Sequence, residues 1–254
     1  MIMPLANERD KHTQVIWAIE DFKQRFGREP EGMWLPETAV DSATLEVLAE
    51  HGIKFTVLAP HQAQSVRKIG EREWQEVDQD SIDTSIGYVC NLASGEQINL
   101  FFYQGPASKE VAYGSLLHSG ELLAEKIFEP LSDDTDKTQL AHIATDGETY
   151  GHHHRKGDMA LAYCLHQIES DEKARLTVYG EYLEKYPPEY EVKIKENTSW
   201  SCAHGVERWR SNCGCCLDEK MCGKQDWRTP LRSALDWLRD HLVKIYEEGM
   251  SDYV

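Results

Sequence analysis

The stretch that decides the fold runs from residue 32 to residue 59 and reads GMWLPETAVDSATLEVLAEHGIKFTVLA. It contains a short apolar run at 32–36, a helix-like segment that Asp41 can cap, and a β-rich run at 53–59 that follows Gly52. Strand, helix and strand in so short a segment predict a βαβ unit. Such a unit requires a parallel sheet, whose strands end at one edge, where loops can gather functional groups.

The rest of the chain continues this alternation of helix and strand. Apolar residues at helical spacing predict helices over 8–26, 109–128, 159–168 and about 231–245. Runs typical of strands predict an inserted β-hairpin from 88–92 and 97–103 and further strands at 140–145 and 191–194. We therefore expect the α/β class, with one domain over 1–197. A Cys- and Trp-rich segment with a C-terminal helix, 198–254, is expected to pack on that domain.

Composition excludes several classes of protein. The chain has 254 residues, and its 27 Lys plus Arg against 44 Asp plus Glu give a formal charge of −17. A nucleic-acid or membrane-surface binder needs clustered positive charge, so neither partner is expected. No apolar stretch is long enough to cross a bilayer, and residues 1–11 lack the layout of a signal peptide. We expect a cytoplasmic protein with reduced thiols, because seven cysteines are unevenly spread.

Two acidic motifs occupy equivalent places, each directly after a predicted strand. Glu37 ends the run at 32–36, and Asp146 and Glu148 follow the run at 140–145. In an α/β barrel both would project into one cleft, and a pair of carboxyl groups across a cleft is what cleavage of a glycosidic bond requires. The aromatic neighbours Trp34 and Tyr150 could stack on sugar rings. The alternative is structural: Glu37 caps the next helix and Asp146 makes a turn with the following glycine.

The two motifs resemble those of a known family. Gly-Met-Trp-Leu-Pro-Glu37 resembles the nucleophile motif of glycoside hydrolase family 57, and Asp146-Gly-Glu-Thr-Tyr-Gly-His152 resembles that family's acid/base motif. The resemblance covers nearly the whole chain. The chain resembles most closely a group of large bacterial family-57-like proteins that carry an uncharacterised C-terminal region. The start of that region resembles residues 197–210 of this chain.

The resemblance implies a (β/α)7-type barrel that acts on α-glucan by a retaining mechanism, as a hydrolase or a 4-α-glucanotransferase-like transglycosylase. Glu37 would be the nucleophile and Asp146 the general acid/base, with the carboxyl groups about 5 to 5.5 Å apart. Glu148, His152 and His153 would bind or orient the substrate. The expected partner is an α-glucan or oligosaccharide, and no cofactor is implied.

The chain departs from the family's pattern at its start. Members begin with a strand that carries a His-Gln-Pro-like motif, and a second motif precedes the nucleophile, whereas only 36 residues precede Glu37 here. We expect an incomplete barrel that lacks its opening strands. Such a barrel exposes an unpaired sheet edge, which a second copy or a partner chain would cover.

Two other functions stay open. The run His152-His153-His154, together with Asp146, could hold a divalent ion in a metal-dependent carbohydrate hydrolase or deacetylase. The chain could also be a non-catalytic carbohydrate-binding remnant of the enzyme, which would bind α-glucan without turnover.

A cluster of Cys, Trp and His residues follows the barrel motifs. Trp200, Trp209 and His204 form either a sugar platform at the cleft rim or a docking surface for the final helix. The cysteine spacing matches neither paired Cys-x-x-Cys units nor a ferredoxin run, so we assign no metal site. The residues to consider as ligands, against reduced thiols, are Cys213, Cys215, Cys216 and Cys222.

Overall fold

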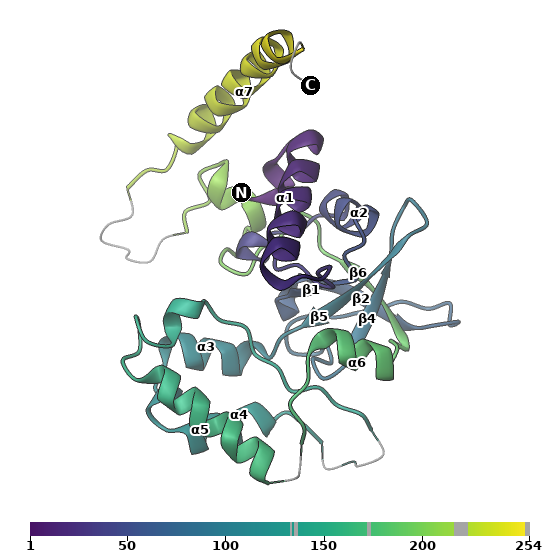
Figure 1. Cartoon of the computed structure of the whole chain (residues 1–254), viewed down its shortest axis with the longest axis vertical. Coiled ribbons are helices and arrows are strands. Elements are labelled where there is room, and N and C mark those ends of the chain that lie inside the picture. The colour runs from purple at the N-terminus through teal and green to yellow at the C-terminus, as the bar shows by residue number, and fades with distance from the viewer. Residues whose placement is uncertain (133, 135–136, 172–173, 216–222, 252–254) are drawn as a thin grey trace.

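A six-stranded mixed sheet lies at the centre of the molecule, with the strand order β1-β5-β4-β6-β2-β3 (Figure 1). The computed structural model describes residues 1–132, 134, 137–171, 174–215 and 223–251. Neighbouring strands are parallel in the pairs β1/β5 and β4/β6 and antiparallel in the other three pairs. The strands are β1 (Phe55–Leu58), β2 (Ala63–Lys68), β3 (Gln75–Glu76), β4 (Gly87–Asn91), β5 (Gln97–Phe102) and β6 (Tyr190–Ile194).

Helices cover the sheet and extend beyond it, which confirms the predicted α/β class. The predicted hairpin forms as β4 and β5 and supplies two central strands of the sheet. The helices in the described residues are α1 (Glu8–Phe26), α2 (Ser42–Glu50), α3 (Gly105–Tyr113), α4 (Gly120–Phe128), α5 (Gly157–Ser170), α6 (Tyr179–Lys185) and α7 (Arg228–Met250).

Capping explains why α1 has the bounds that the sequence predicts. The Asn7 side chain accepts a hydrogen bond from the N–H of Asp10 at 2.7 Å, and Gly27 ends the helix in the left-handed region with φ +67°. The predicted single helix over 109–128 is wrong, because α3 ends at Gly114 and α4 starts anew after Ser119, whose side chain caps it.

Two predicted strands are extended segments without a ladder. In the run at 32–36, Gly32 alone forms a bridge, in parallel with Phe55 of β1. The run at 140–145 makes single hydrogen bonds instead. The N–H of Leu140 donates to the carbonyl of Ser85, and the carbonyl of His142 accepts from the N–H of Gln104, between β5 and α3, at 3.1 Å. Both segments still reach the end of the sheet, which is what places the acidic motifs.

The two faces of the sheet have separate cores, and alternate residues of β5 supply both. Leu100 and Phe102 point toward α1 and α2, where the largest apolar cluster lies. Phe101 points to the other face and packs with Tyr182 of α6. Fully burying a side chain of this size contributes about 1.5–3 kcal/mol, so this alternation fixes the register of the sheet.

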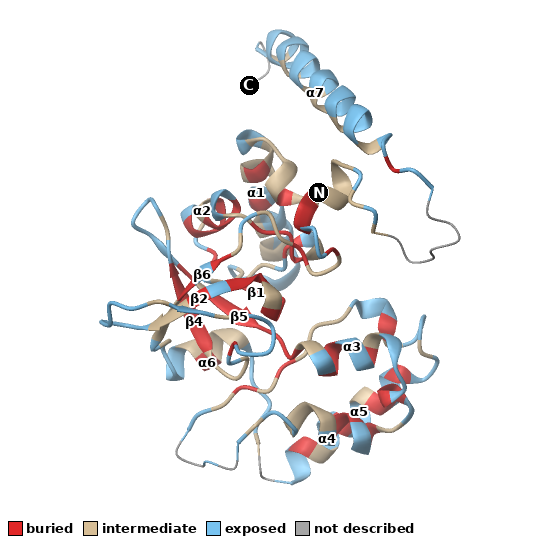
Figure 2. Cartoon of the chain, turned by 180° about the vertical axis from the view of Figure 1, so that it is seen from behind, coloured by how far each residue is buried: buried red, intermediate tan, exposed pale blue. Residues whose placement is uncertain are grey.

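A third apolar cluster joins α3, α4 and α5 beside the sheet (Figures 1 and 2). Its fully buried members are Val111, Leu123 and Cys164, from α3, α4 and α5 respectively. Gly120 lets these two helices approach, since a Cβ there would lie 2.7 Å from the carbonyl oxygen of Ala160. The cluster gives the chain a helical subassembly whose α3 borders the pocket described below.

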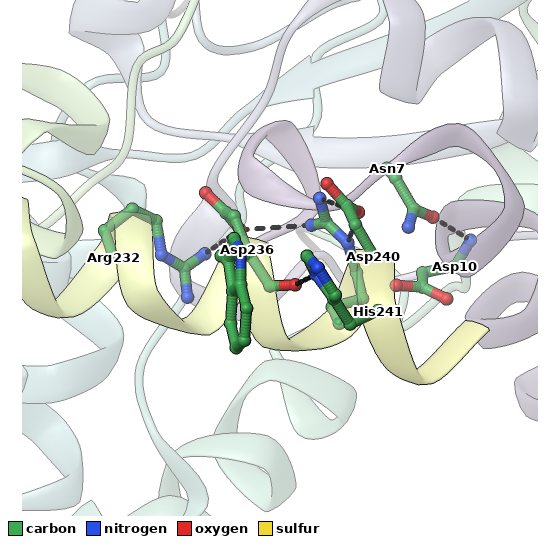
Figure 3. Close-up of polar contacts among 8 residues, drawn as sticks. Asn7, Asp10, Arg232, Asp236, Asp240 and His241 are labelled. Atoms are coloured by element: carbon green, nitrogen blue, oxygen red, sulfur yellow. Dashed lines mark hydrogen bonds and ion pairs between the residues drawn. The ribbon is translucent and has the colours of Figure 1, made fainter. Parts of the chain in front are cut away.

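The C-terminal helix α7, predicted from the sequence, contains no buried residue (Figure 2). Polar side chains along it include Arg232, Asp236 and Asp240 (Figure 3), and Asp236 pairs with Arg232 at 3.9 Å. Arg239 pairs with Asp236 at 3.1 Å and with Asp240 at 2.8 Å. Exposed pairs of this kind contribute little to stability. None of the helices among the described residues has the length and apolar content needed to cross a membrane.

Candidate active site

Glu37 lies in a turn whose backbone is left-handed at two successive residues. Pro36–Thr38 forms one 3-10 turn, and φ is +59° at Glu37 and +47° at Thr38. A residue other than glycine costs about 1–3 kcal/mol in this region, and Thr38 is also β-branched. Contacts from elsewhere in the chain must therefore hold the turn.

Gln62, which is fully buried, provides these contacts. Its Oε1 accepts from Oγ1 of Thr38 and from the N–H of Ala59, both at 2.8 Å. Its Nε2 donates to the carbonyl of Thr38 at 2.8 Å and to Oγ1 of Thr198 at 3.1 Å. One side chain thus ties the Glu37 turn to the end of β1 and to the segment after β6.

The side chain of Glu37 is half-buried and held on one oxygen only. Its Oε2 accepts from the indole Nε1 of Trp200 at 3.0 Å and from Oγ of Ser201 at 2.6 Å. The backbone N–H of Trp200 also donates to the carbonyl of Glu37 at 3.1 Å. Within the described part of the chain, Oε1 accepts no hydrogen bond. The carboxylate is therefore oriented, with one oxygen left for another task.

Aromatic rings surround this carboxylate. Trp34, which is exposed, meets Trp200 edge-on with 5.1 Å between ring centroids, and Tyr103 also meets Trp200 edge-on, with 6.2 Å between centroids. Burial raises the pKa of Tyr103, so its hydroxyl stays protonated at neutral pH. Rings in such an arrangement offer apolar faces with polar tips, as sugar-binding surfaces do.

Asp146 lies where the extended segment at 140–145 ends. The N–H of Ala144 donates to Oγ of Ser108 in α3 at 3.0 Å, which ties this segment to the helix. Asp146 is exposed and precedes a short 3-10 turn, Gly147–Thr149, without capping it through its side chain. The carboxylate is thus free for contacts outside the chain.

A pocket of about 570 Å³ lies between Asp146 and the two residues that bind Glu37, and Glu37 itself is not among its lining residues. Asp146 lines it, together with Trp200 and Ser201, the two residues that hold Glu37. Several other polar lining residues were not selected from the sequence, among them His61, Asp80, Lys109 and Tyr113. For His61 a signal existed, because it lies three residues after the end of β1, where loops at strand ends gather functional groups.

A buried histidine, His142, anchors the segment that leads to Asp146. His142 Nδ1 lies 2.9 Å from the hydroxyl of Tyr179, and its Nε2 lies 2.9 Å from the carbonyl of Thr84. Burial lowers the pKa of His142 to about 4, although the backbone contacts oppose this shift. The imidazole is therefore neutral at physiological pH and acts as a structural group.

The other residues predicted around Asp146 lie outside the pocket lining. The N–H groups of His152 and His153 donate to the carbonyl of Glu148 at 3.1 and 3.0 Å, and all three side chains are exposed. Tyr150 accepts a hydrogen bond from Oγ1 of Thr145 at 3.2 Å, and its ring packs on the helical cluster. Asp146 therefore lines the pocket, whereas the residues that follow it in the turn do not.

Of the three residues predicted as a sugar platform, Trp200 alone lines the pocket. The guanidinium of Arg208 lies 5.9 Å from the ring centroid of Trp209. His204 is exposed, and its Nδ1 lies 3.3 Å from Sγ of Cys215.

Four residues with metal-binding side chains meet beside this segment, and their ligand atoms all lie within 4.8 Å of one another. Two of the cysteines considered from the sequence belong to the group, and the other two, Cys216 and Cys222, lie outside the described residues. Among the described residues this is the one such group of three or more. It consists of Cys202, His204, Cys213 and Cys215.

The sheet, the pocket and the two acidic motifs define an α/β protein with a carboxylate at the end of each of two extended segments. The chain belongs to glycosyl hydrolase family 57, whose family model matches residues 1–195. A domain of unknown function, DUF3536, matches residues 224–254. The cysteine cluster thus lies between the two matched regions.

Curated relatives and solved structures agree with this assignment. The alpha-amylase of Pyrococcus abyssi is 23% identical over 209 residues, which are 77% of this chain and 29% of that protein. The 4-alpha-glucanotransferase of Thermococcus litoralis is 26% identical over 181 residues, which are 68% and 24% of the two chains. This chain therefore spans less than a third of the length of these relatives.

Two solved structures show the same fold. An exo-type maltose-forming amylase from Pyrococcus sp. ST04 matches 91% of this chain and 42% of its own, with a TM-score of 0.69 and 16% identity. The 4-alpha-glucanotransferase from Thermococcus litoralis matches 100% of this chain and 35% of its own, with a TM-score of 0.60 and 18% identity. The six-stranded sheet is thus part of the family's α/β barrel architecture.

Proposed function

We propose that this chain carries the catalytic carboxylates of a retaining enzyme that hydrolyses or transfers α-glucan. Glu37 is the nucleophile and Asp146 the general acid/base. The observation that carries the proposal is the shared pocket: Trp200 and Ser201, which hold Oε2 of Glu37, line the same cavity as Asp146.

In the first step, Oε1 of Glu37 attacks the anomeric carbon of the sugar while the bond to the leaving oxygen breaks. The protonated carboxyl of Asp146 gives its proton to that oxygen, which leaves as a hydroxyl. The donors Trp200 and Ser201 keep the Glu37 carboxylate in one orientation, so the attack needs no reorganisation of the nucleophile.

In the second step, the Asp146 carboxylate accepts a proton from water or from a sugar hydroxyl. The resulting oxygen attacks the anomeric carbon, and the bond to Glu37 breaks with its electron pair returning to the carboxylate. Water gives hydrolysis, and a sugar hydroxyl gives transfer. Configuration at the anomeric carbon is retained because each step inverts it.

Substrate binding is proposed for the aromatic group beside Glu37. Trp34 and Trp200 offer ring faces and edges next to the nucleophile, and Tyr103 also contacts the ring of Trp200. The curated relatives named above are an alpha-amylase and a 4-alpha-glucanotransferase, which supports α-glucan as the substrate class. Glu148, His152 and His153 remain proposed as rim contacts for longer chains.

The metal-dependent alternative is less well supported. In the described part of the chain, Asp146, His152 and His153 do not form a group whose ligand atoms converge. The non-catalytic alternative predicts that α-glucan binds without turnover and that Glu37→Gln leaves both properties unchanged.

The test is turnover of malto-oligosaccharides by the full chain and two variants. Glu37→Gln and Asp146→Asn should each lower kcat by at least about 100-fold, as loss of a nucleophile or of a general acid/base does. Matched controls are Glu31→Gln, at a surface pair with Lys54, and Asp171→Asn, beyond the end of α5. Activity close to that of the parent in either catalytic variant would refute the assignment.

A cytoplasmic location and a second copy or partner chain that completes the barrel are further proposals. The edge strand β1 is paired on its open side by a single bridge to Gly32, which leaves the rest of that edge for another strand. Light scattering of the purified chain tests the second proposal, and a mass equal to one chain of 29.1 kDa without any partner would contradict it.

A further inference from the structure

The cluster of three cysteines and one histidine lies directly beside the residues that hold Glu37. Cys202 is adjacent to Ser201 in the sequence, and its Sγ lies 3.9 Å from Sγ of Cys213 and 3.6 Å from Sγ of Cys215. The Nδ1 of His204 lies 3.3 Å from Sγ of Cys215. Four ligand atoms of the kind that zinc prefers therefore converge on one point.

These separations fit a tetrahedral ion. With zinc–sulfur bonds of about 2.3 Å, two thiolates at a tetrahedral zinc lie about 3.8 Å apart. The two sulfur–sulfur distances of 3.9 and 3.6 Å bracket that value. A disulfide would use two of the three thiols at about 2.05 Å and would leave the third thiol and the imidazole unexplained.

The backbone is shaped to bring the ligands together. The pairs are Cys202-Ala-His204 and Cys213-Gly-Cys215, each with one residue between the ligands. Gly214 has φ +75°, which lets the chain reverse between its two cysteines. Gly205 follows His204 with φ +67°, and a Cβ there would lie 2.0 Å from the carbonyl oxygen of Asn197.

Residues from the start of α7 support the ligands. The guanidinium of Arg228 donates to Sγ of Cys213 at 3.5 Å, and Gln225, which is buried, donates to the carbonyl of Cys215 at 2.9 Å. Three thiolates and a neutral imidazole around a divalent cation carry a net negative charge, which Arg228 balances. Contacts of this kind orient metal ligands in protein sites.

We propose that Cys202, His204, Cys213 and Cys215 bind one zinc ion at a four-coordinate structural site. Cys202 is buried, and the other three ligands reach the surface, so the ion can enter from solvent. The ion fixes the loop that begins at Trp200 and thereby the two donors to Glu37. Zinc binding itself does not depend on the proposed function. The role of the ion in positioning the donors to Glu37 rests on the proposed function.

The experiment measures zinc in the full chain, purified without a polyhistidine tag. Elemental analysis should find about one zinc per chain, and Cys202→Ser and Cys215→Ser should lose it. The matched control is Cys164→Ser, a buried cysteine of α5 far from the cluster, which should keep zinc. Because a serine variant can fail to fold, zinc release from the parent chain by a mercurial thiol reagent provides a second measurement.

Three results would overturn the proposal. These are absence of zinc after reconstitution with Zn²⁺, iron in its place, and an intact mass two hydrogens lighter that reveals a disulfide. Loss of zinc in Cys222→Ser with full retention in Cys202→Ser would also overturn the ligand set.

The positioning role has a separate readout. Glu37→Gln should keep full zinc, because the carboxylate is not a ligand, whereas chelation of the parent should lower kcat more than it changes KM. Readdition of Zn²⁺ should restore kcat. Zinc bound at full stoichiometry with kcat unchanged on its removal would overturn the link to Glu37 and leave the two catalytic carboxylates unaffected.

Discussion

Replacing Gln62 by Met should lower the free energy of unfolding and disturb the Glu37 turn. Met has nearly the same volume, so the substitution leaves the packing intact and removes the polar amide. The amide makes four hydrogen bonds at 2.8, 2.8, 2.8 and 3.1 Å. Three of the partner groups lose their partner in the variant: the N–H of Ala59 and the hydroxyl and carbonyl of Thr38.

The magnitude follows from these orphaned groups. Each buried donor or acceptor left unsatisfied costs about 1–3 kcal/mol. Three such groups lower the free energy of unfolding by at least about 3 kcal/mol. This is a large part of the total free energy of unfolding of a typical domain, which is about 5–15 kcal/mol. The oxygen of Thr198 keeps the carbonyl of Lys195 as a partner and adds little.

Equilibrium unfolding in urea, followed by circular dichroism, measures this loss. Gln64→Met is the matched control, because Gln64 lies two residues further along the chain, on β2, with an exposed side chain. The control should change the free energy of unfolding by less than about 0.5 kcal/mol. If Gln62→Met loses less than about 1 kcal/mol, the amide does not hold the turn and the reasoning fails.

Two further predictions concern pH and the nucleophile. Because burial lowers the pKa of His142 to about 4, below the unfolded value of about 6.5, its contribution to stability is complete above pH 6.5 and is lost progressively as the pH falls from 6.5 to 4. Urea unfolding should show the parent losing about 2–3 kcal/mol more than His142→Gln between pH 7 and 4.5, and parallel curves would contradict this. Ser201→Ala removes the 2.6 Å hydrogen bond to Glu37 and should lower kcat about tenfold with the melting temperature unchanged. An unchanged kcat would show that this donor has no catalytic role.

The sequence predicted those elements whose bounds depend on residues close by in the chain. Asn7 and Gly27 cap α1, and the hairpin of β4 and β5 follows from its alternating residues. The break between α3 and α4 also had a signal, since Gly114 and the capping Ser119 interrupt the helical pattern. The run at 140–145 looked like a strand because apolar residues fill it, yet no neighbouring strand pairs with it. Pairing is a tertiary property that periodicity does not report.

The candidate site likewise has residues that the sequence predicts and contacts that it does not predict. Glu37 and Asp146 could be selected from their motifs, and the structure brings Asp146 into one pocket with the residues that hold Glu37. The role of Gln62 was invisible, because its four partners come from three separate segments. The histidine of the cysteine cluster was noted from the sequence, but its eight-residue separation from the second pair matches no common metal motif.

Covalent trapping of the nucleophile tests the role of Glu37. The full chain is incubated with 5-fluoro-α-glucosyl fluoride, digested and analysed by mass spectrometry. We expect a glycosyl adduct on the peptide that contains Glu37 and no adduct in Glu37→Gln. An adduct on another carboxylate such as Asp80, or turnover of the substrate without any adduct at Glu37, would show that Glu37 is not the nucleophile.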